Sequence, residues 1–210
     1  MSRKTVTVTL LLVFISIGLF ATTPESWVNS SFVYDIPYKS GLTLSSGQED
    51  AIGYDFSWFA FPRNSDIGLE TKFAMSFSLD ANPAFLRLFL FTGPTFTSVL
   101  AGGVTGFLSV GPFYALTGTD TATSILEQQL GAAVDLGARF RFAGNEIWDF
   151  ALILGTFADL AFLHIVDETR VSGLSGSILP YIGFSFGSAF NWRYTRYYPR
   201  YSVYSPVLYF

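Results

Sequence analysis

Charged residues in this chain often occupy every second position of an apolar segment, and this spacing is the first guide to their chemistry. Between residues 67 and 79, Phe73 and Met75 share one parity with other apolar side chains, whereas Glu70 and Lys72 share the other. Because side chains alternate across a β-strand, Glu70 and Lys72 lie on the face opposite the apolar one. Acids and bases gathered on one protected face can pair and hydrogen-bond into a polar network.

The same parity rule places other charged residues on that face. We predict a polar network of Asp55, Glu70, Lys72, Arg87, Asp135, Arg139, Arg141 and Asp159, with Asp35, Glu127 and Asp149 beside it. Two uses of this network remain open. The side chains could pair into a plug, because an unpaired charge away from water is unfavourable, or they could form a polar gate below a pocket.

Nucleophilic and metal chemistry have little support in the sequence. The sole histidine is His164, and the chain contains no cysteine. Parity directs His164 to the apolar face without a serine within two residues, so we predict an interfacial residue and not a catalytic base. One histidine without cysteine does not make a transition-metal site. We therefore predict no enzyme activity, no catalytic residue, no metal and no cofactor.

The composition indicates a chain with partly apolar surroundings. Apolar residues make up 50% of the sequence and aromatic residues 18%, whereas charged residues make up only 13%. Soluble domains carry about 25% charged residues. The formal net charge is −4, and without a basic patch nothing in the sequence indicates a nucleic-acid partner.

The N-terminus has the pattern of a secretory signal. Arg3 and Lys4 precede an apolar run over residues 6–21, which matches the charged and hydrophobic regions of a signal peptide. We predict a signal over residues 1–21 with cleavage between residues 21 and 23. An uncleaved membrane anchor is the alternative. The absence of cysteine excludes a lipoprotein anchor and a disulfide framework.

Alternation recurs along nearly the whole remaining chain. It predicts eight strands, over residues 30–39, 51–62, 67–79, 85–96, 99–116, 126–142, 147–166 and 177–192. Mostly long connections alternate with short ones, as in barrels whose surface loops and periplasmic turns lie on opposite rims. We predict an all-β fold, a transmembrane up-and-down antiparallel β-barrel of eight strands over residues 22–192, in the bacterial outer membrane.

Two apolar stretches could instead suggest spanning helices. The first, residues 85–116, contains Pro94 and Pro112, and the second, residues 150–166, contains Asp159 and is short for a span. Period two fits both stretches better than a helical period.

Aromatic residues near the strand ends predict an interfacial belt. Trp148 begins the seventh predicted strand and Trp192 ends the eighth, so we expect both at the periplasmic rim, where indole rings favour the interface. Residues 193–210 are either a Tyr-rich tail or the closing strand. The sequence does not decide between them, because Pro206 is poorly placed within a closing strand although Phe210 ends the chain.

Residues 130–140, residues 179–184 and the terminal Phe210 give the chain a resemblance to the small eight-stranded outer-membrane barrels, which include the OmpA membrane domain and the OmpW/AlkL proteins. The resemblance implies that Phe210 is an insertion signal for the barrel-insertion machinery. It also implies periplasmic chaperones and outer-membrane lipid as partners.

In OmpW/AlkL-like barrels a hydrophobic pocket opens sideways through a break in the wall. The resemblance therefore implies passive uptake of small hydrophobic molecules, with a lateral opening at Pro94, Pro112 and Pro180, which lie inside predicted strands. These prolines could instead simply end or bend the strands near the rims. The alternative is a non-transporting structural or adhesin-like barrel. A lipid-modifying enzyme is a more remote alternative.

Overall fold

The structure is a computed structural model, and it describes residues 25–40, 50–62, 65–78, 85–119, 126–144, 148–166, 169–171 and 173–188. Nine strands form: β1 (Glu25–Ser40), β2 (Ala51–Phe61), β3 (Ile67–Ser78), β4 (Phe85–Ala101), β5 (Val104–Thr119), β6 (Leu126–Gly144), β7 (Trp148–Val166), β8 (Thr169–Val171) and β9 (Leu174–Ser188). Within these ranges no helix is long and apolar enough to cross a membrane.

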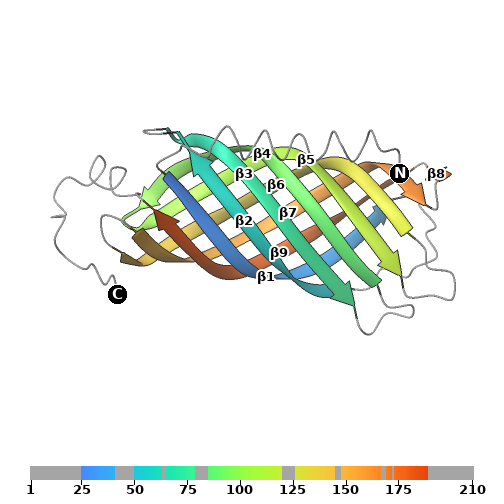
Figure 1. Ribbon diagram of the computed structural model, residues 1–210, viewed down its shortest axis with the longest axis horizontal. Helices are drawn as coiled ribbons and strands as arrows, with labels where there is room; N and C mark the ends of the chain where they lie inside the picture. Colours follow the sequence, from blue (N-terminus) through green and yellow to red (C-terminus); the bar gives the residue numbers. More distant parts are fainter. Residues whose placement is uncertain are drawn as a thin grey trace.

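Eight of the strands close into a ring. Each strand from β1 to β7 pairs antiparallel with the next, β7 also pairs with β9, and β9 pairs with β1. The short β8 lies outside the ring and pairs only with the end of β7. Figure 1 shows the ring from the side, with strands tilted steeply against the long axis. The predicted eight-stranded up-and-down antiparallel barrel is confirmed.

The two rims of the barrel are distinguished by where the ring begins and ends. Ser26 of β1 lies opposite Ser188 of β9, and we call this end the proximal rim. The connection between β4 and β5 also lies there. We call the other end the distal rim, where β1 ends and β2 begins. Since β9 closes the ring against β1, the described barrel is complete without residues 193–210, which lie outside the described residues.

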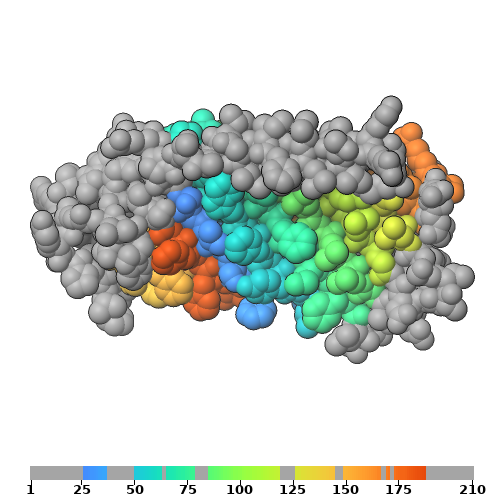
Figure 2. Space-filling view, viewed as in Figure 1, coloured from blue at the N-terminus to red at the C-terminus, as the bar shows by residue number. Residues whose placement is uncertain are grey.

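Alternating burial explains why these sequences form a barrel. The outward parity carries large apolar side chains, such as Phe32 at 71% exposure and Phe184 at 54%. The inward parity carries buried aromatic and polar residues. Figure 2 shows one side of this wall, in which the side chains of neighbouring strands form a continuous surface. A ring closed by hydrogen bonds leaves no strand edge unpaired in hydrocarbon.

One predicted turn is wrong. The sequence placed a turn at residues 97–98, but β4 continues to Ala101 and the turn lies at Gly102 and Gly103. Gly103 adopts a φ of 79°, a conformation that glycine reaches without a steric penalty and that a tight hairpin requires. The glycine pair was therefore the turn signal.

Candidate functional site

The interior of the barrel is filled by three polar layers separated by aromatic rings. Of the eight residues predicted to form the polar network, seven are at most 5% exposed, and Arg141 is half-buried. We name the layers middle, proximal and distal after their depth. Each layer is built around one buried cation.

The middle layer surrounds Lys72 of β3. Its ammonium is ion-paired with Asp135 of β6 and lies 3.2 Å from Asp55 of β2 and 3.9 Å from Glu70. The Tyr181 hydroxyl donates to Asp135 at 2.7 Å, and the Lys72 nitrogen lies 4.1 Å from the centre of the Tyr181 ring. Three carboxylates thus converge on one ammonium and tie strands from opposite parts of the ring together.

The proximal layer surrounds Arg139 of β6. Its guanidinium forms a bidentate ion pair with Asp149 of β7, with one N···O distance of 3.0 Å. It also donates a hydrogen bond to Ser185 of β9 at 2.7 Å. The guanidinium carbon also lies 5.1 Å from the Trp27 ring centre. Arg141 is farther out, with its Nε 4.0 Å from Asp149.

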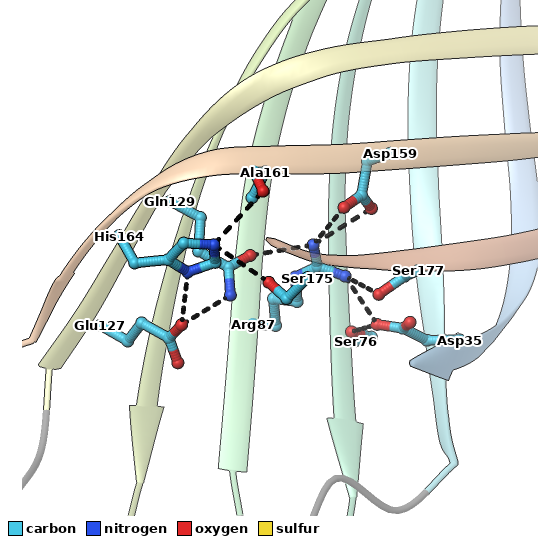
Figure 3. Close-up of polar contacts among 10 residues, drawn as sticks. All are labelled: Asp35, Ser76, Arg87, Glu127, Gln129, Asp159, Ala161, His164, Ser175 and Ser177. Carbon is cyan, nitrogen blue, oxygen red and sulfur yellow. Dashed lines mark hydrogen bonds and ion pairs between the residues drawn. The ribbon is translucent and has the colours of Figure 1, made fainter. Parts of the chain in front are cut away.

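The distal layer surrounds Arg87 of β4 (Figure 3). The guanidinium contacts both carboxylate oxygens of Asp159 at 3.0 and 3.1 Å. It also lies 3.4 Å from Asp35 and donates to Ser177. Asp35 in turn accepts a hydrogen bond from Ser76 at 2.6 Å. The layer therefore crosses the lumen from β1 to β7.

His164 extends the distal layer toward the rim. Its Nδ1 lies 3.2 Å from Glu127 Oε1, and its Nε2 lies 3.3 Å from the Ala161 carbonyl and 3.4 Å from Ser175 Oγ. Gln129 links this group to Arg87, because its amide donates to Glu127 at 2.8 Å and its oxygen lies 3.3 Å from the guanidinium. Figure 3 shows the two groups side by side.

The prediction for His164 is wrong. We expected the imidazole to face lipid headgroups, but the side chain is completely buried. The reason is a β-bulge between β6 and β7: Leu130 lies opposite Leu163 and Gly131 lies opposite Ala161, so Phe162 is an extra residue. An extra residue reverses the parity of the side chains that follow.

The predicted prolines lie where hydrogen-bond ladders are interrupted. The pairing of β4 with β5 stops after Phe91 and resumes at Thr95, and this gap contains Pro94 and lies opposite Pro112. The β1 and β9 ladder has a similar gap opposite Pro180, between the pairs Val33–Tyr181 and Ile36–Ile178.

The wall is nevertheless closed at the β4 and β5 gap. A Cβ added at Gly93 would meet the Val110 carbonyl oxygen at 2.3 Å, and one added at Gly111 would meet the Thr92 oxygen at 2.2 Å. The two backbones therefore lie in contact. The structure shows an interrupted ladder without an opening.

Several sequence predictions fall outside what the structure describes. Trp148 is the first residue of β7, but its side chain is not described. Trp192 and Phe210 lie outside the described residues. The signal over residues 1–21 lies outside them as well.

Sequence reasoning missed the neutral partners of the charged groups. Ser76, Ser175, Ser177, Ser185 and Tyr181 all hydrogen-bond to charged or titratable side chains inside the barrel. Their inward parity was a usable signal. The tilt of the strands decides which serine lies at the same depth as which charged side chain. Parity alone does not give this tilt.

The fold resembles that of solved outer-membrane barrels. Neisserial surface protein A aligns with a TM-score of 0.58 and 13% identity, covering 79% of this chain and 97% of that one. Ail, the attachment invasion locus protein of Yersinia pestis, gives 0.50 and 14%, covering 78% and 99%. OprG from Pseudomonas aeruginosa gives 0.51 and 11%, covering 79% and 96%.

No family model and no curated protein sequence matches the chain. The structural similarity at these identities concerns the fold alone. The barrel fold and the apolar outer face are those of a protein of the bacterial outer membrane.

Proposed function

We propose that this chain is a sealed outer-membrane barrel that acts as a structural or surface-interaction protein and does not conduct through its lumen. One observation carries this proposal: large side chains fill the interior at every depth. These side chains are aromatic and at most 1% exposed. Near the proximal rim they are Trp27, Phe59 and Phe61, and farther toward the distal rim they are Phe91, Phe113 and Phe157.

The geometry of small barrels supports a closed interior. Eight strands leave a lumen just wide enough for side chains or one small ligand. Here Phe89 stacks on Phe157 with ring centres 5.3 Å apart, and Phe91 packs edge-on against the same ring. Because the charged layers above and below also cross the lumen, solutes lack an axial path through the described strands.

A sealed barrel leaves its rims as the surfaces that can meet other molecules. Two of the similar structures are named a surface protein and an attachment invasion locus protein, and we propose a role of that general kind for this chain. Lipid around the apolar face, chaperones and the barrel-insertion machinery are the other partners that we propose.

Planar-bilayer recording of the folded protein tests the sealed lumen. The wild type should give no stable conductance steps. Phe157→Ala removes one of the aromatic rings that fill the lumen, and this variant should be more permeable or less stable than the wild type. Phe73→Ala on the lipid face is the matched control for permeability. Reproducible ohmic steps in the wild type would overturn the proposal.

A second candidate function is passive uptake of small hydrophobic molecules through the wall. The interrupted β4 and β5 ladder at Pro94 and Pro112 favours it, since proline has no backbone N–H to donate to a neighbouring strand. Entry of a labelled medium-chain fatty acid into proteoliposomes is the assay. Uptake in the wild type that slows in the Pro94→Val, Pro112→Val variant supports a lateral path, whereas no uptake in the wild type rules it out.

A further inference from the structure

Three side chains from neighbouring strands line up near the distal rim in the order acid, imidazole, hydroxyl. Glu127 comes from β6, His164 from β7 and Ser175 from β9 (Figure 3). Glu127 Oε1 lies 3.2 Å from His164 Nδ1, and His164 Nε2 lies 3.4 Å from Ser175 Oγ. The bulge at Phe162 creates this alignment, because it turns His164 into the lumen.

The contact with Glu127 favours one tautomer of the ring. A carboxylate only accepts, so Nδ1 carries the proton in its contact with Glu127. In the neutral ring Nε2 is then bare and faces the Ser175 hydroxyl as an acceptor. This is the tautomer in which an imidazole can take a proton from a serine.

The same surroundings also suit the protonated ring. The Ala161 carbonyl lies 3.3 Å from Nε2, so it can accept a hydrogen bond once Nε2 gains a proton. Glu127 stabilises the resulting positive charge from the other side of the ring. Its carboxylate is held in place by Gln129, whose amide donates at 2.8 Å.

We propose that Ser175 is a nucleophilic serine, with His164 as its general base and Glu127 as the residue that orients the imidazole. The substrate class is a carboxylic ester that enters from the distal rim. Ser175 is the second residue of β9 and His164 lies two residues before the end of β7, so the group lies close to that rim. All three side chains are at most 5% exposed, and the distal end must open before an ester contacts Ser175.

The proposed reaction proceeds in two steps. Ser175 Oγ forms a bond to the ester carbonyl carbon while its proton passes to Nε2. The bond to the leaving alcohol then breaks, and the alcohol takes the proton from Nε2. Water next attacks the acyl-serine, its proton passing through Nε2 to Ser175 Oγ as the carboxylic acid departs. This activity is independent of whether the lumen conducts.

Labelling with a fluorophosphonate probe tests the proposal on the folded full-length protein. We expect a single phosphonate adduct on Ser175, located by peptide mass spectrometry, and slow turnover of p-nitrophenyl acetate. His164→Gln should reduce the labelling rate by about 100-fold, the lower range for a lost general base.

Matched variants separate catalysis from packing. Ser175→Ala should abolish the adduct. Ser109 is another fully buried serine, and it faces the lumen from β5. Ser109→Ala should therefore leave the labelling rate at Ser175 unchanged. Heat-modifiable gel mobility establishes that each variant is folded. No adduct on Ser175 in the folded wild type, or equal labelling of Ser175 in folded His164→Gln, would overturn the proposal.

Discussion

The middle and distal layers each bury a titratable side chain completely, but the two side chains reach the lumen by different routes. Lys72 lies in a regular stretch of β3, where strict alternation places it inward. His164 follows a bulge in β7, and alternation counted along the strand would place it outward. The interior of a barrel is therefore set by parity where ladders are regular and by the positions of bulges elsewhere.

The surroundings of the two side chains differ as well. The carboxylates of three different residues lie within 4 Å of the Lys72 ammonium. His164 instead contacts one carboxylate and two neutral groups. A buried cation among several acids has a structural role, because its removal leaves those acids buried without a positive partner. The imidazole of His164 instead lies between one acid and one hydroxyl, which is the arrangement that the proposed proton transfer requires.

Removal of the middle-layer cation should have the largest effect. Lys72→Leu leaves three buried carboxylates without their shared cation, and we expect it to lower the free energy of unfolding by about 3 to 5 kcal/mol. Urea titration in lipid vesicles, followed by gel mobility, measures it. Adding Asp55→Asn and Asp135→Asn should restore part of the loss. A loss below about 1 kcal/mol in Lys72→Leu would contradict the role given to this layer.

A charge on the opposite face of the same strand should have the next largest effect. Phe73 neighbours Lys72 and is 47% exposed toward the surroundings of the barrel. Phe73→Arg should destabilise the folded barrel by about 2 to 4 kcal/mol if this position lies near the bilayer midplane. Phe73→Leu is the control and should change little. Tolerance of arginine there would mean that the assigned faces are reversed.

A smaller effect should come from neutralising the surplus acid of the middle layer. Glu70 is farther from the ammonium than Asp55 is, and it is completely buried. Glu70→Gln removes like-charge repulsion with Asp135, so we expect a gain on the order of 1 kcal/mol. Asp135→Asn, which breaks the close ion pair, should destabilise the barrel. A clear loss in Glu70→Gln would show that Lys72 needs all three acids.

Deletion of Phe162 should have the smallest effect and tests the bulge. Without this residue Leu163 follows Ala161 directly, and the β6 and β7 ladder becomes regular while His164 stays inward. We expect a change in stability below about 1 kcal/mol, since the residue is lipid-facing and unpaired. Substituting His164 with cysteine in this background and testing its protection from maleimide measures the orientation. A thiol that becomes accessible would contradict the parity argument.

These comparisons show how much of the molecule could be predicted from the sequence. Alternation was sufficient for the closed antiparallel ring and for the inward positions of Lys72, Arg87 and Arg139. It failed at His164 because one extra residue reverses parity, and at the β4 and β5 turn because alternation does not mark where a strand ends, whereas the turn uses the positive φ of Gly103. Pairings across the lumen, such as Arg87 with Asp159, depend on the tilt and register of distant strands.

Cysteine accessibility inside the barrel tests the sealed lumen most directly, and the chain has no native cysteine to interfere. Ala133 faces the lumen from β6 at 1% exposure, and Gly102 lies exposed in the turn at the proximal rim. In folded protein, a charged, water-soluble thiol reagent should modify Gly102→Cys within minutes and leave Ala133→Cys unmodified until the barrel is unfolded. Modification of Ala133→Cys in the folded state at a rate similar to that of Gly102→Cys would show a water-filled lumen and contradict the account.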